Sequence, residues 1–383
     1  MSKKTVLFIS YDGMTDPLGQ SQVIPYLAGL TKEGYDFVIL SCDKPAKYKA
    51  NKTYVEKLIA PYSISWVSIP YHKNPPVLSS VYDYFKLKQT AKQLHKQYHF
   101  SMVHTRPGVP QLVALYLKKK LGIKFMNDIR GFWADERVDG GMWNLKNPLY
   151  KMVYNFFRSK EDECVSIADY NTCLTYKAKD ILGTWKQVPQ PVKVAVVPCS
   201  VDLELFDPNA IDQQLKAAFK KELNIDDNDF IISYLGSIGG WYLTKEMMQF
   251  CKLLLNKKPE SKFLFISNNN HNDIIAAAAL YNIPADKIIV KMGKRHEVPA
   301  LLSFSWPGHC LRSLHAAAAH HRPQSDVPQR YRRAAGYGSS APGPLDHQMG
   351  GNGLRRFAPG RIHRHGLPHC AQRPARPGAA GSA

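Results

Sequence analysis

The chain has 383 residues and carries 51 Lys and Arg against 31 Asp and Glu, a net charge of +20. This length allows two domains with sizeable cores, and no apolar run approaches the ~18 residues of a membrane-spanning helix. The seven Cys form no CxxC pair, which argues against a zinc finger or a disulfide framework. Asp12 interrupts the short apolar start, so no signal peptide is indicated and we expect a cytoplasmic protein.

Short apolar runs alternate with amphipathic stretches in the first part of the chain. The predicted strands are residues 6–10, 37–41, 64–69, 102–104, 124–128, 172–175 and 194–197. The predicted helices are residues 20–32, 54–60, 81–97, 110–120 and 148–166. This alternation predicts right-handed βαβ units and a doubly wound parallel sheet, so we expect a Rossmann-like domain at residues 1–205.

A second series follows residues 207–229, a polar segment interpreted as part of the connection between domains. Its predicted strands are residues 230–235, 262–267 and 288–292, and its predicted helices are residues 244–255, 273–281 and 296–303. The pattern then stops. The expected fold class is therefore α/β with two Rossmann-like domains, the second of which, at residues 206–304, is incomplete.

The composition changes near residue 305. All 35 Lys lie in residues 1–300, whereas residues 301–383 contain no Lys or Glu but 11 Arg, 11 Gly, 9 Pro and 8 His. Because a core needs apolar side chains at fixed periods, we interpret residues 305–383 as a disordered or non-native tail. Reading the codons of His309–Arg312 one base later permits Ile-Val-Phe-Val, a good strand, which favours a shifted reading frame as the origin of the tail.

In doubly wound sheets, ligands bind beyond the carboxyl ends of the strands. Residues 11–22 join the first predicted strand to its helix and exceed the usual 2–6 residues of such a loop. Here Asp16, Gly19, Gln20 and Ser21 are candidate ligand-binding residues: Gly19 permits close approach of a ligand, and Ser21 is expected to cap the helix. A purely structural turn is the alternative.

Residues 128–143 leave another predicted strand and combine acids with two Arg, three Gly and two Trp. Such a mixture suits a sugar, because carboxylates bind hydroxyls, Arg binds phosphate and flat rings cover pyranose faces. Asp128, Arg130 and Glu136 are the candidate catalytic residues. The alternative is a loop packed by ion pairs.

In the second series, Gly236, Ser237 and Gly239 follow a strand and precede a helix that carries Lys245. Backbone amides of such a loop, with a Lys as a point charge, could bind a diphosphate. The loop is not GxGxxG, so it does not specify a dinucleotide. At the end of the strand predicted at 288–292, Gly293 and Arg295 are further candidates for binding a nucleotide, although an ordinary turn is equally consistent.

Two features of charge and composition leave alternatives open. Lys118, Lys119 and Lys120 end an apolar helix and fit either a solvated helix end or a basic rim resting on anionic lipid. The histidines of the tail have no regular spacing, so no metal is expected.

The motifs resemble those of a bacterial retaining glycosyltransferase of family 4, which has the GT-B fold. The sequences that carry the likeness are YDGMTDPLGQSQV at 11–23, DIRGFWADERVDGGMW at 128–143, VPCSVD at 197–202 with Phe206, and GSIGGWY at 236–242. The resemblance spans residues 5–304. It implies transfer of a sugar from a nucleotide-sugar on the second domain to a glycan or lipid-linked acceptor on the first, with retention and without a metal cofactor, in surface polysaccharide synthesis at the inner face of the membrane.

The sequence departs from that family at several places. Ser200 stands where the family has Gly, and Ser237 stands where it often has Arg. After residue 303 the Glu that grips the donor ribose and the Gly-x-Pro-Val turn are missing, so we expect impaired activity. The alternatives are a non-catalytic acceptor-binding remnant and nucleic-acid binding by the basic tail. The tail has few rings to stack on bases, so we expect no nucleic-acid partner.

Overall fold

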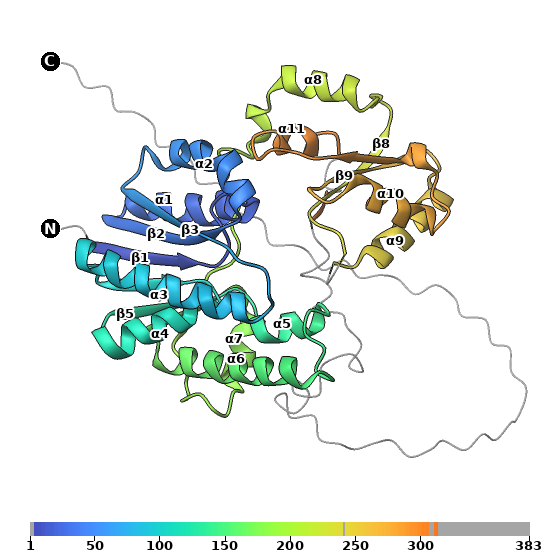
Figure 1. Ribbon diagram of the computed structural model, residues 1–383. Helices are drawn as coiled ribbons and strands as arrows, with labels where there is room; N and C mark the ends of the chain where they lie inside the picture. The colour runs from blue at the N-terminus through green and yellow to red at the C-terminus, as the bar shows by residue number, and fades with distance from the viewer. Residues whose placement is uncertain (1–3, 240–241, 306–309, 313–383) are drawn as a thin grey trace, which may run out of the picture. The chain divides into compact units, whose positions relative to one another are not determined.

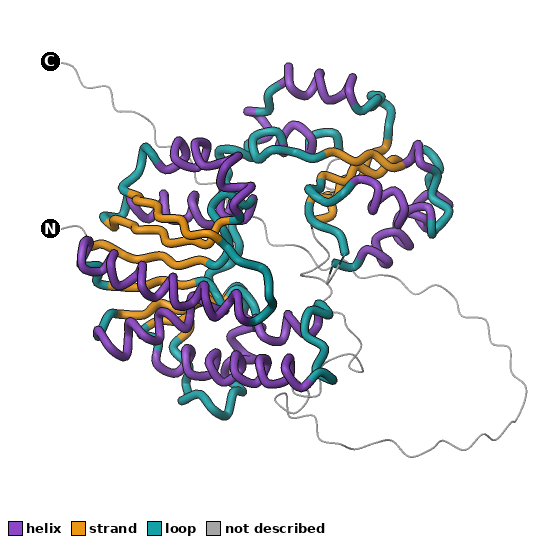
Figure 2. The backbone as a smooth tube through the Cα atoms, in the orientation of Figure 1, coloured by secondary structure: helices purple, strands orange, loops and turns teal. Residues whose placement is uncertain are grey.

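Two parallel β-sheets, each with helices on both faces, make up the part of the chain that the structure describes. In the computed structural model this part comprises residues 4–239, 242–305 and 310–312 (Figure 1). The first sheet has the strand order β3-β2-β1-β4-β5-β6-β7 and the second has the order β10-β9-β8-β11. Figure 2 shows the strands of each sheet enclosed by helices.

The first sheet is built from strands close to those predicted. They are β1 (Lys4–Ser10), β2 (Tyr35–Asp43), β3 (Ile64–Pro70), β4 (Met102–Thr105), β5 (Lys124–Ile129), β6 (Tyr170–Cys173) and β7 (Val194–Val196). Its helices are η1 (Gly19–Val23), α1 (Ile24–Thr31), α2 (Pro45–Ile59), α3 (Leu78–Tyr98), α4 (Val109–Leu121), α5 (Trp133–Asp139), α6 (Pro148–Ile167) and α7 (Tyr176–Gly183).

Both faces of the first sheet are buried, which explains the continuous apolar stretches in its central strands β1 and β2. In β1, Leu7 and Ile9 pack with α3, α4 and α6, whereas Val6 and Phe8 pack with α1 and α2. Successive side chains of a strand point to opposite faces, so one run serves two cores. A third cluster packs α7 against the β5–β6 side of the sheet.

A chain of buried side-chain amides crosses the first sheet. Gln111 Oε1 accepts a hydrogen bond from Gly108 N at 2.9 Å, and Gln111 Nε2 donates to Asn127 Oδ1 at 2.7 Å. Asn127 Nδ2 donates to Asn171 Oδ1 at 2.9 Å, and Asn171 Nδ2 donates to Val165 O at 3.1 Å. Every link pairs a donor with an acceptor, so these polar groups are buried without an unsatisfied amide between them.

The second sheet contains β8 (Phe230–Leu235), β9 (Ser261–Ile266), β10 (Ile288–Lys291) and β11 (Cys310–Arg312). Its helical segments are η2 (Pro208–Ala210), α8 (Gln213–Glu222), α9 (Thr244–Lys257), α10 (His271–Ala279), η3 (Ala285–Lys287) and α11 (Val298–Leu302). Helices α9 and α10 cover one face, and α8 and α11 cover the other. One strand lies beyond the boundary expected at residue 304, because β11 pairs in parallel with β8.

Several boundaries differ from those predicted, for physical reasons. Helix α2 begins nine residues earlier than expected, because its buried positions start only at Val55 and its first half is solvated. Helix α8 lies in the segment interpreted as a connection, where Phe219 is its one buried residue. Helices α5 and α7 were missed because each is short. Apart from β11, residues 306–383 lie outside the described part of the chain, so the interpretation of the tail stays a prediction.

Candidate functional site

The carboxyl edge of the first sheet gathers charged residues where its strand order reverses, between β1 and β4. Loops leave such a pair of strands toward opposite faces and make room for a ligand. Arg106 follows β4 and Arg130 follows the neighbouring β5, so two guanidinium groups lie at this edge. Arg130 was predicted from the sequence, whereas Arg106 was missed; its signal was a cation directly after a short buried strand.

Arg106 is a buried cation that is incompletely paired. It is 5% exposed, its Nη2 faces Gln22 Oε1 at 3.5 Å, and its Nε has no hydrogen-bond partner within the described residues. Burial lowers the pKa of Arg106 and the nearby Arg130 lowers it further, while Asp128 and Asp12 oppose the shift. A buried guanidinium with a spare N–H is suited to an anionic or carbonyl group of a ligand.

Asp128, predicted as catalytic, holds the second cation in place. Its Oδ2 accepts a hydrogen bond from Arg130 Nε at 2.8 Å, and its Oδ1 accepts one from Thr172 Oγ1 at 3.0 Å. His104 Nε2 lies 3.6 Å from Asp128 Oδ2, too far for a hydrogen bond. Burial raises the pKa of Asp128, but His104 and Arg130 outweigh it, so the pKa lies well below its ordinary value. The carboxylate is therefore charged and acts by positioning Arg130.

Glu136, the third predicted catalytic residue, lies in the first turn of α5. A Cβ at position 131 would fall 1.7 Å from Glu136 Oε1, so only Gly131 lets this carboxylate lie against the loop. Burial raises the pKa of Glu136, and the charge of Arg137 opposes the shift. The Arg137 guanidinium lies over the Trp133 ring at 4.7 Å. The structure thus brings Asp128 and Arg130 into contact and places Glu136 beside the residue that follows them.

Asp43, at the end of β2, fixes the first loop and was not predicted from the sequence. Its Oδ1 accepts hydrogen bonds from Thr15 N at 2.9 Å and Thr15 Oγ1 at 2.7 Å. Its Oδ2 accepts hydrogen bonds from Ser41 Oγ at 2.6 Å and Ser68 Oγ at 2.8 Å. Asp43 is 1% exposed, so a buried carboxylate holds the loop to β2 and β3.

Three of the four candidate residues of the loop at 11–22 contact other parts of the protein, and the fourth, Ser21, has no side-chain hydrogen bond within the described residues. Asp16 pairs with two lysines at the start of α2, and Gln20 Nε2 donates to Thr15 O at 3.2 Å. A Cβ at Gly19 would lie 2.5 Å from the loop backbone, so Gly19 is required for packing. Ser21 does not cap the helix as expected, because helical backbone begins at Gly19 and Ser21 lies exposed inside η1.

A histidine and a buried acid form a second cluster at the same edge, which was not predicted. Asp83, on α3, is fully buried and its Oδ2 accepts hydrogen bonds from Tyr11 Oη at 2.8 Å and His72 N at 3.1 Å. His72 Nδ1 lies 2.6 Å from Asp83 Oδ1. Burial is the main cause that raises the pKa of Tyr11. An imidazole oriented through Nδ1 leaves Nε2 as the ring atom that can hydrogen-bond a ligand.

In the glycine loop of the second sheet, residues 236–239, most backbone amides donate hydrogen bonds within the protein. Gly236, Ile238 and Gly239 donate their N–H groups to acceptors in the protein. Ser237 N has no such acceptor among the described residues, and Ser237 O accepts a hydrogen bond from the Tyr234 hydroxyl at 2.6 Å. Lys245 is exposed in the first turn of α9. The loop therefore offers fewer amides to a diphosphate than its glycines suggest.

Gly293 and Arg295, the remaining donor-binding candidates, contact the protein. A Cβ at Gly293 would lie 2.9 Å from Leu301 Cδ1, so the glycine permits packing of α11. Arg295 Nη2 donates to Asp202 Oδ2 at 2.8 Å. The Leu205 amide is the main cause that lowers the pKa of Asp202, and Arg295 adds to it against partial burial. Arg295 thus ties the segment after β7 to the end of β10.

Comparison with known proteins gives structural likeness without sequence likeness. No protein-family model and no curated protein matches the sequence. Among solved structures, the chain is similar to a glycosyltransferase from Rickettsia africae ESF-5, with 15% identity over 80% of this chain and 72% of that chain and a TM-score of 0.52. Sucrose-phosphate synthase from Thermosynechococcus elongatus gives 13% identity over 79% and 74%, with a TM-score of 0.56. Anabaena HepE, solved with UDP and glucose, gives 8% identity over 78% and 72%, with a TM-score of 0.54.

The fold is of the GT-B type, as predicted from the sequence. Within the described residues, no three His, Cys, Asp or Glu side chains gather closely enough to hold a metal ion, and the histidines of residues 309–369 lie outside that part. No described helix combines the length and the apolar character needed to cross a bilayer.

Proposed function

We propose that this protein is a retaining glycosyltransferase, which transfers a sugar from a nucleotide-sugar donor to a glycan or lipid-linked acceptor in surface polysaccharide synthesis. The observation that carries the proposal is the Asp128–Arg130 pair beside buried Arg106, at the carboxyl edge of a GT-B-type sheet. The proposal is supported by the family 4 resemblance of residues 128–143, the segment that supplies this pair. It is also supported by similarity to a sucrose-phosphate synthase and to a protein solved with UDP and glucose.

Each charged group has a role in the proposed reaction. Sugar transfer builds positive charge on the sugar and negative charge on the departing diphosphate, so fixed charges placed beforehand stabilise the transition state. We assign Lys245 and Ser237 N to the diphosphate, and Arg106 and Arg130 to polar groups of the acceptor. Asp128 positions Arg130, and Glu136 binds a hydroxyl. No metal cofactor is part of the proposal, which places the reaction at the inner face of the cell membrane.

The altered C-terminus should limit this activity. The proposal is that residues after about 305 come from a shifted frame, so the ribose-binding Glu of the family is missing. Resequencing the gene across codons 300–315 tests the frame directly. An extra or missing base would support the shift, whereas a confirmed read would assign the altered donor domain to the protein itself.

The activity test compares the purified chain with a frame-restored chain. Both are incubated with a panel of UDP-, GDP- and ADP-sugars and a lipid-linked glycan extract, and nucleoside diphosphate release is measured by chromatography. We expect release by the restored chain and much weaker release by the chain as given. Failure of both chains to bind any nucleotide-sugar at millimolar concentration would refute the transferase. Binding of the glycan extract alone would favour the non-catalytic alternative.

A further inference from the structure

Helix α3 carries an exposed face that no part of the proposed reaction uses. In its first two turns, large apolar side chains are exposed: Leu78 by 66%, Val81 by 46%, Tyr82 by 50% and Phe85 by 54%. The helix contains a single acid, Asp83, which is fully buried on the opposite side. The outer face is therefore apolar at its start and free of negative charge along its length.

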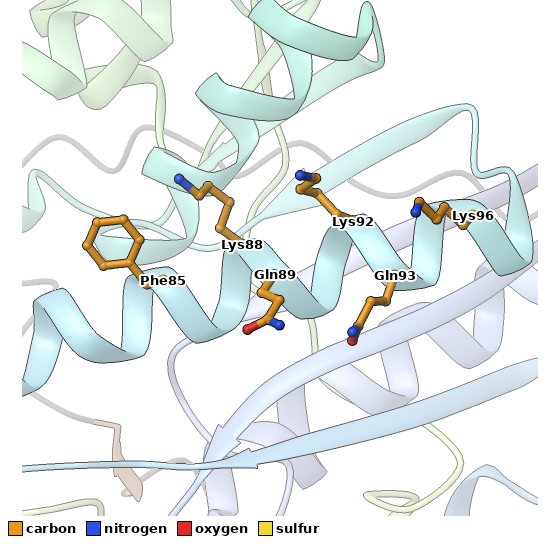
Figure 3. A pocket seen from close by; sticks show the side chains of 6 residues that line it. All are labelled: Phe85, Lys88, Gln89, Lys92, Gln93 and Lys96. Atoms are coloured by element: carbon orange, nitrogen blue, oxygen red, sulfur yellow. The ribbon is translucent and has the colours of Figure 1, made fainter.

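Lysines continue the same face toward the end of the helix. Lys88, Lys92 and Lys96 lie four residues apart and line a shallow hollow with Phe85, Gln89 and Gln93 (Figure 3). Residues at this spacing share one side of a helix. Lys88 Nζ lies 4.9 Å from the centre of the Phe85 ring. Within the described residues none of these three lysines takes part in an ion pair. Lys92 and Lys96 are exposed, whereas Lys88 is partly buried and its Nζ also lies 5.0 Å from the centre of the Tyr116 ring.

The basic run expected to form a lipid-facing rim has a different environment. Lys118 pairs with Asp169 at 2.7 Å, and Lys119 pairs with Glu163. Two of the three charges of Lys118–Lys120 are therefore compensated by carboxylates, and that run is a poor electrostatic site. In contrast, Lys88, Lys92 and Lys96 of α3 have no carboxylate partner among the described residues.

We infer that the outer face of α3 docks on an anionic lipid bilayer, with Leu78–Phe85 at the level of the acyl chains and Lys88–Lys96 at the headgroups. Exposed aliphatic and aromatic side chains followed by lysines on one helical face have the chemistry of an interfacial helix. Lysines also bury long methylene stems while their ammonium groups reach phosphates. An acidic protein would match the lysines but would leave four apolar side chains uncovered.

The outer face of α3 lies near the candidate site, so membrane docking would bring that site close to the bilayer. This role of the docking rests on the proposed function. Asp83 lies in the second turn of α3 and accepts the hydrogen bond of Tyr11, the residue after β1. The apolar start of α3 is thus next to the carboxyl edge of the first sheet. A lipid-linked acceptor could reach that edge while its lipid stays in the membrane.

Vesicle sedimentation of the full chain tests the inference without any sugar. The vesicles contain phosphatidylcholine alone or with 30% phosphatidylglycerol, at 0.1 M salt. The test variant combines Lys88→Glu, Lys92→Glu and Lys96→Glu. The matched control makes the same change at Lys177, Lys179 and Lys186, which are exposed and unpaired among the described residues around α7. We expect the α3 variant to lose at least roughly 100-fold in anionic vesicle affinity, because losing each lysine near such a surface costs about fivefold and each added carboxylate is also repelled by the anionic lipid.

A second variant tests the apolar end: Val81→Ser with Phe85→Ser should lose the part of binding that survives 0.5 M salt. Equal losses in the α3 and α7 variants, or binding unchanged by either, would overturn the inference. Binding of single-stranded oligonucleotides, lost in the α3 variant while vesicles are ignored, would assign the face to nucleic acid instead. Nucleotide-sugar binding is measured on the same variants and should not change, so failure of membrane docking remains distinct from failure of the proposed transferase.

Discussion

Replacement of Asp43 by Ala should loosen the first loop far more than its small change in volume suggests. The carboxylate accepts four hydrogen bonds, two from Thr15 and one each from Ser41 and Ser68, and it is 1% exposed. The Asp43→Ala variant leaves these donors in a buried space without an acceptor. The Thr15 amide has no alternative partner, because a backbone N–H cannot rotate as a hydroxyl can.

The cost can be worked from these contacts. Hydrogen bonds to a charged group contribute about 1.5–3 kcal/mol each, so four of them amount to roughly 6–12 kcal/mol. Relief from keeping a carboxylate out of water offsets several kcal/mol of this sum, which leaves a net loss of about 3–5 kcal/mol. Asp43→Asn should cost less, about 1–2 kcal/mol, because its amide oxygen still accepts from Thr15 while the serine hydroxyls turn to accept from its NH₂.

Urea unfolding followed by tryptophan fluorescence measures the global effect, and hydrogen exchange of the Thr15 amide measures the local one. Asp16→Ala is the matched control, because this carboxylate belongs to the same loop but pairs only with lysines that are largely exposed. Such surface pairs contribute about 0–1 kcal/mol. Equal losses in the Asp43 and Asp16 variants, with unchanged exchange at Thr15, would refute the anchoring role of Asp43.

Three further predictions concern other buried groups. Gly19→Ala should cost about 1–3 kcal/mol in thermal unfolding, because its Cβ meets fixed backbone at 2.5 Å, whereas Gly29→Ala, with open space in α1, should gain about 0.5–1 kcal/mol. Burial raises the pKa of Glu161 to about 7, so its contribution to stability is full below about pH 4.5 and is lost as pH rises through 7. In the Glu161→Gln variant, the free energy of unfolding should therefore decrease less steeply over this range, by up to about 1.4 kcal/mol per pH unit. Asp128 has a pKa well below its ordinary value, so Asp128→Asn should destabilise the protein at pH 7, and the difference in urea unfolding should shrink as pH falls below about 4.

Much of the fold could be predicted because a parallel sheet buries both faces of its strands. Residues 6–9 of β1, 37–40 of β2 and 230–232 of β8 are apolar without interruption, so the position of these strands follows from composition alone. Helices that bury few side chains against a sheet give a weaker hydrophobic pattern in the sequence. In α8 the apolar positions that mark a helix are reduced to a few, and the surrounding Lys and Gln are equally typical of a linker.

The candidate site could be predicted only where charged side chains directly follow a strand in the sequence. Asp128 and Arg130 are two residues apart at the end of β5, so their contact follows from local geometry. The pair of His72 and Asp83 was hidden, because 11 residues of loop and helix separate its members. The signal for Asp83 was present nevertheless, as the single acid in a long basic helix.

The amide chain through Gln111, Asn127 and Asn171 has a consequence for how the sheet is assembled. A strand displaced by two residues keeps its apolar side chains on the correct faces, so hydrophobic packing alone discriminates poorly against that error. Asn127 lies opposite Asn171 only in the native alignment. Any displacement leaves buried amide groups without hydrogen-bond partners, at a cost of about 1–3 kcal/mol for each unsatisfied group. The hydrogen-bonded amides therefore specify the register between two strands whose residues are 44 positions apart in sequence. They disfavour misaligned sheets that hydrophobic packing alone would permit.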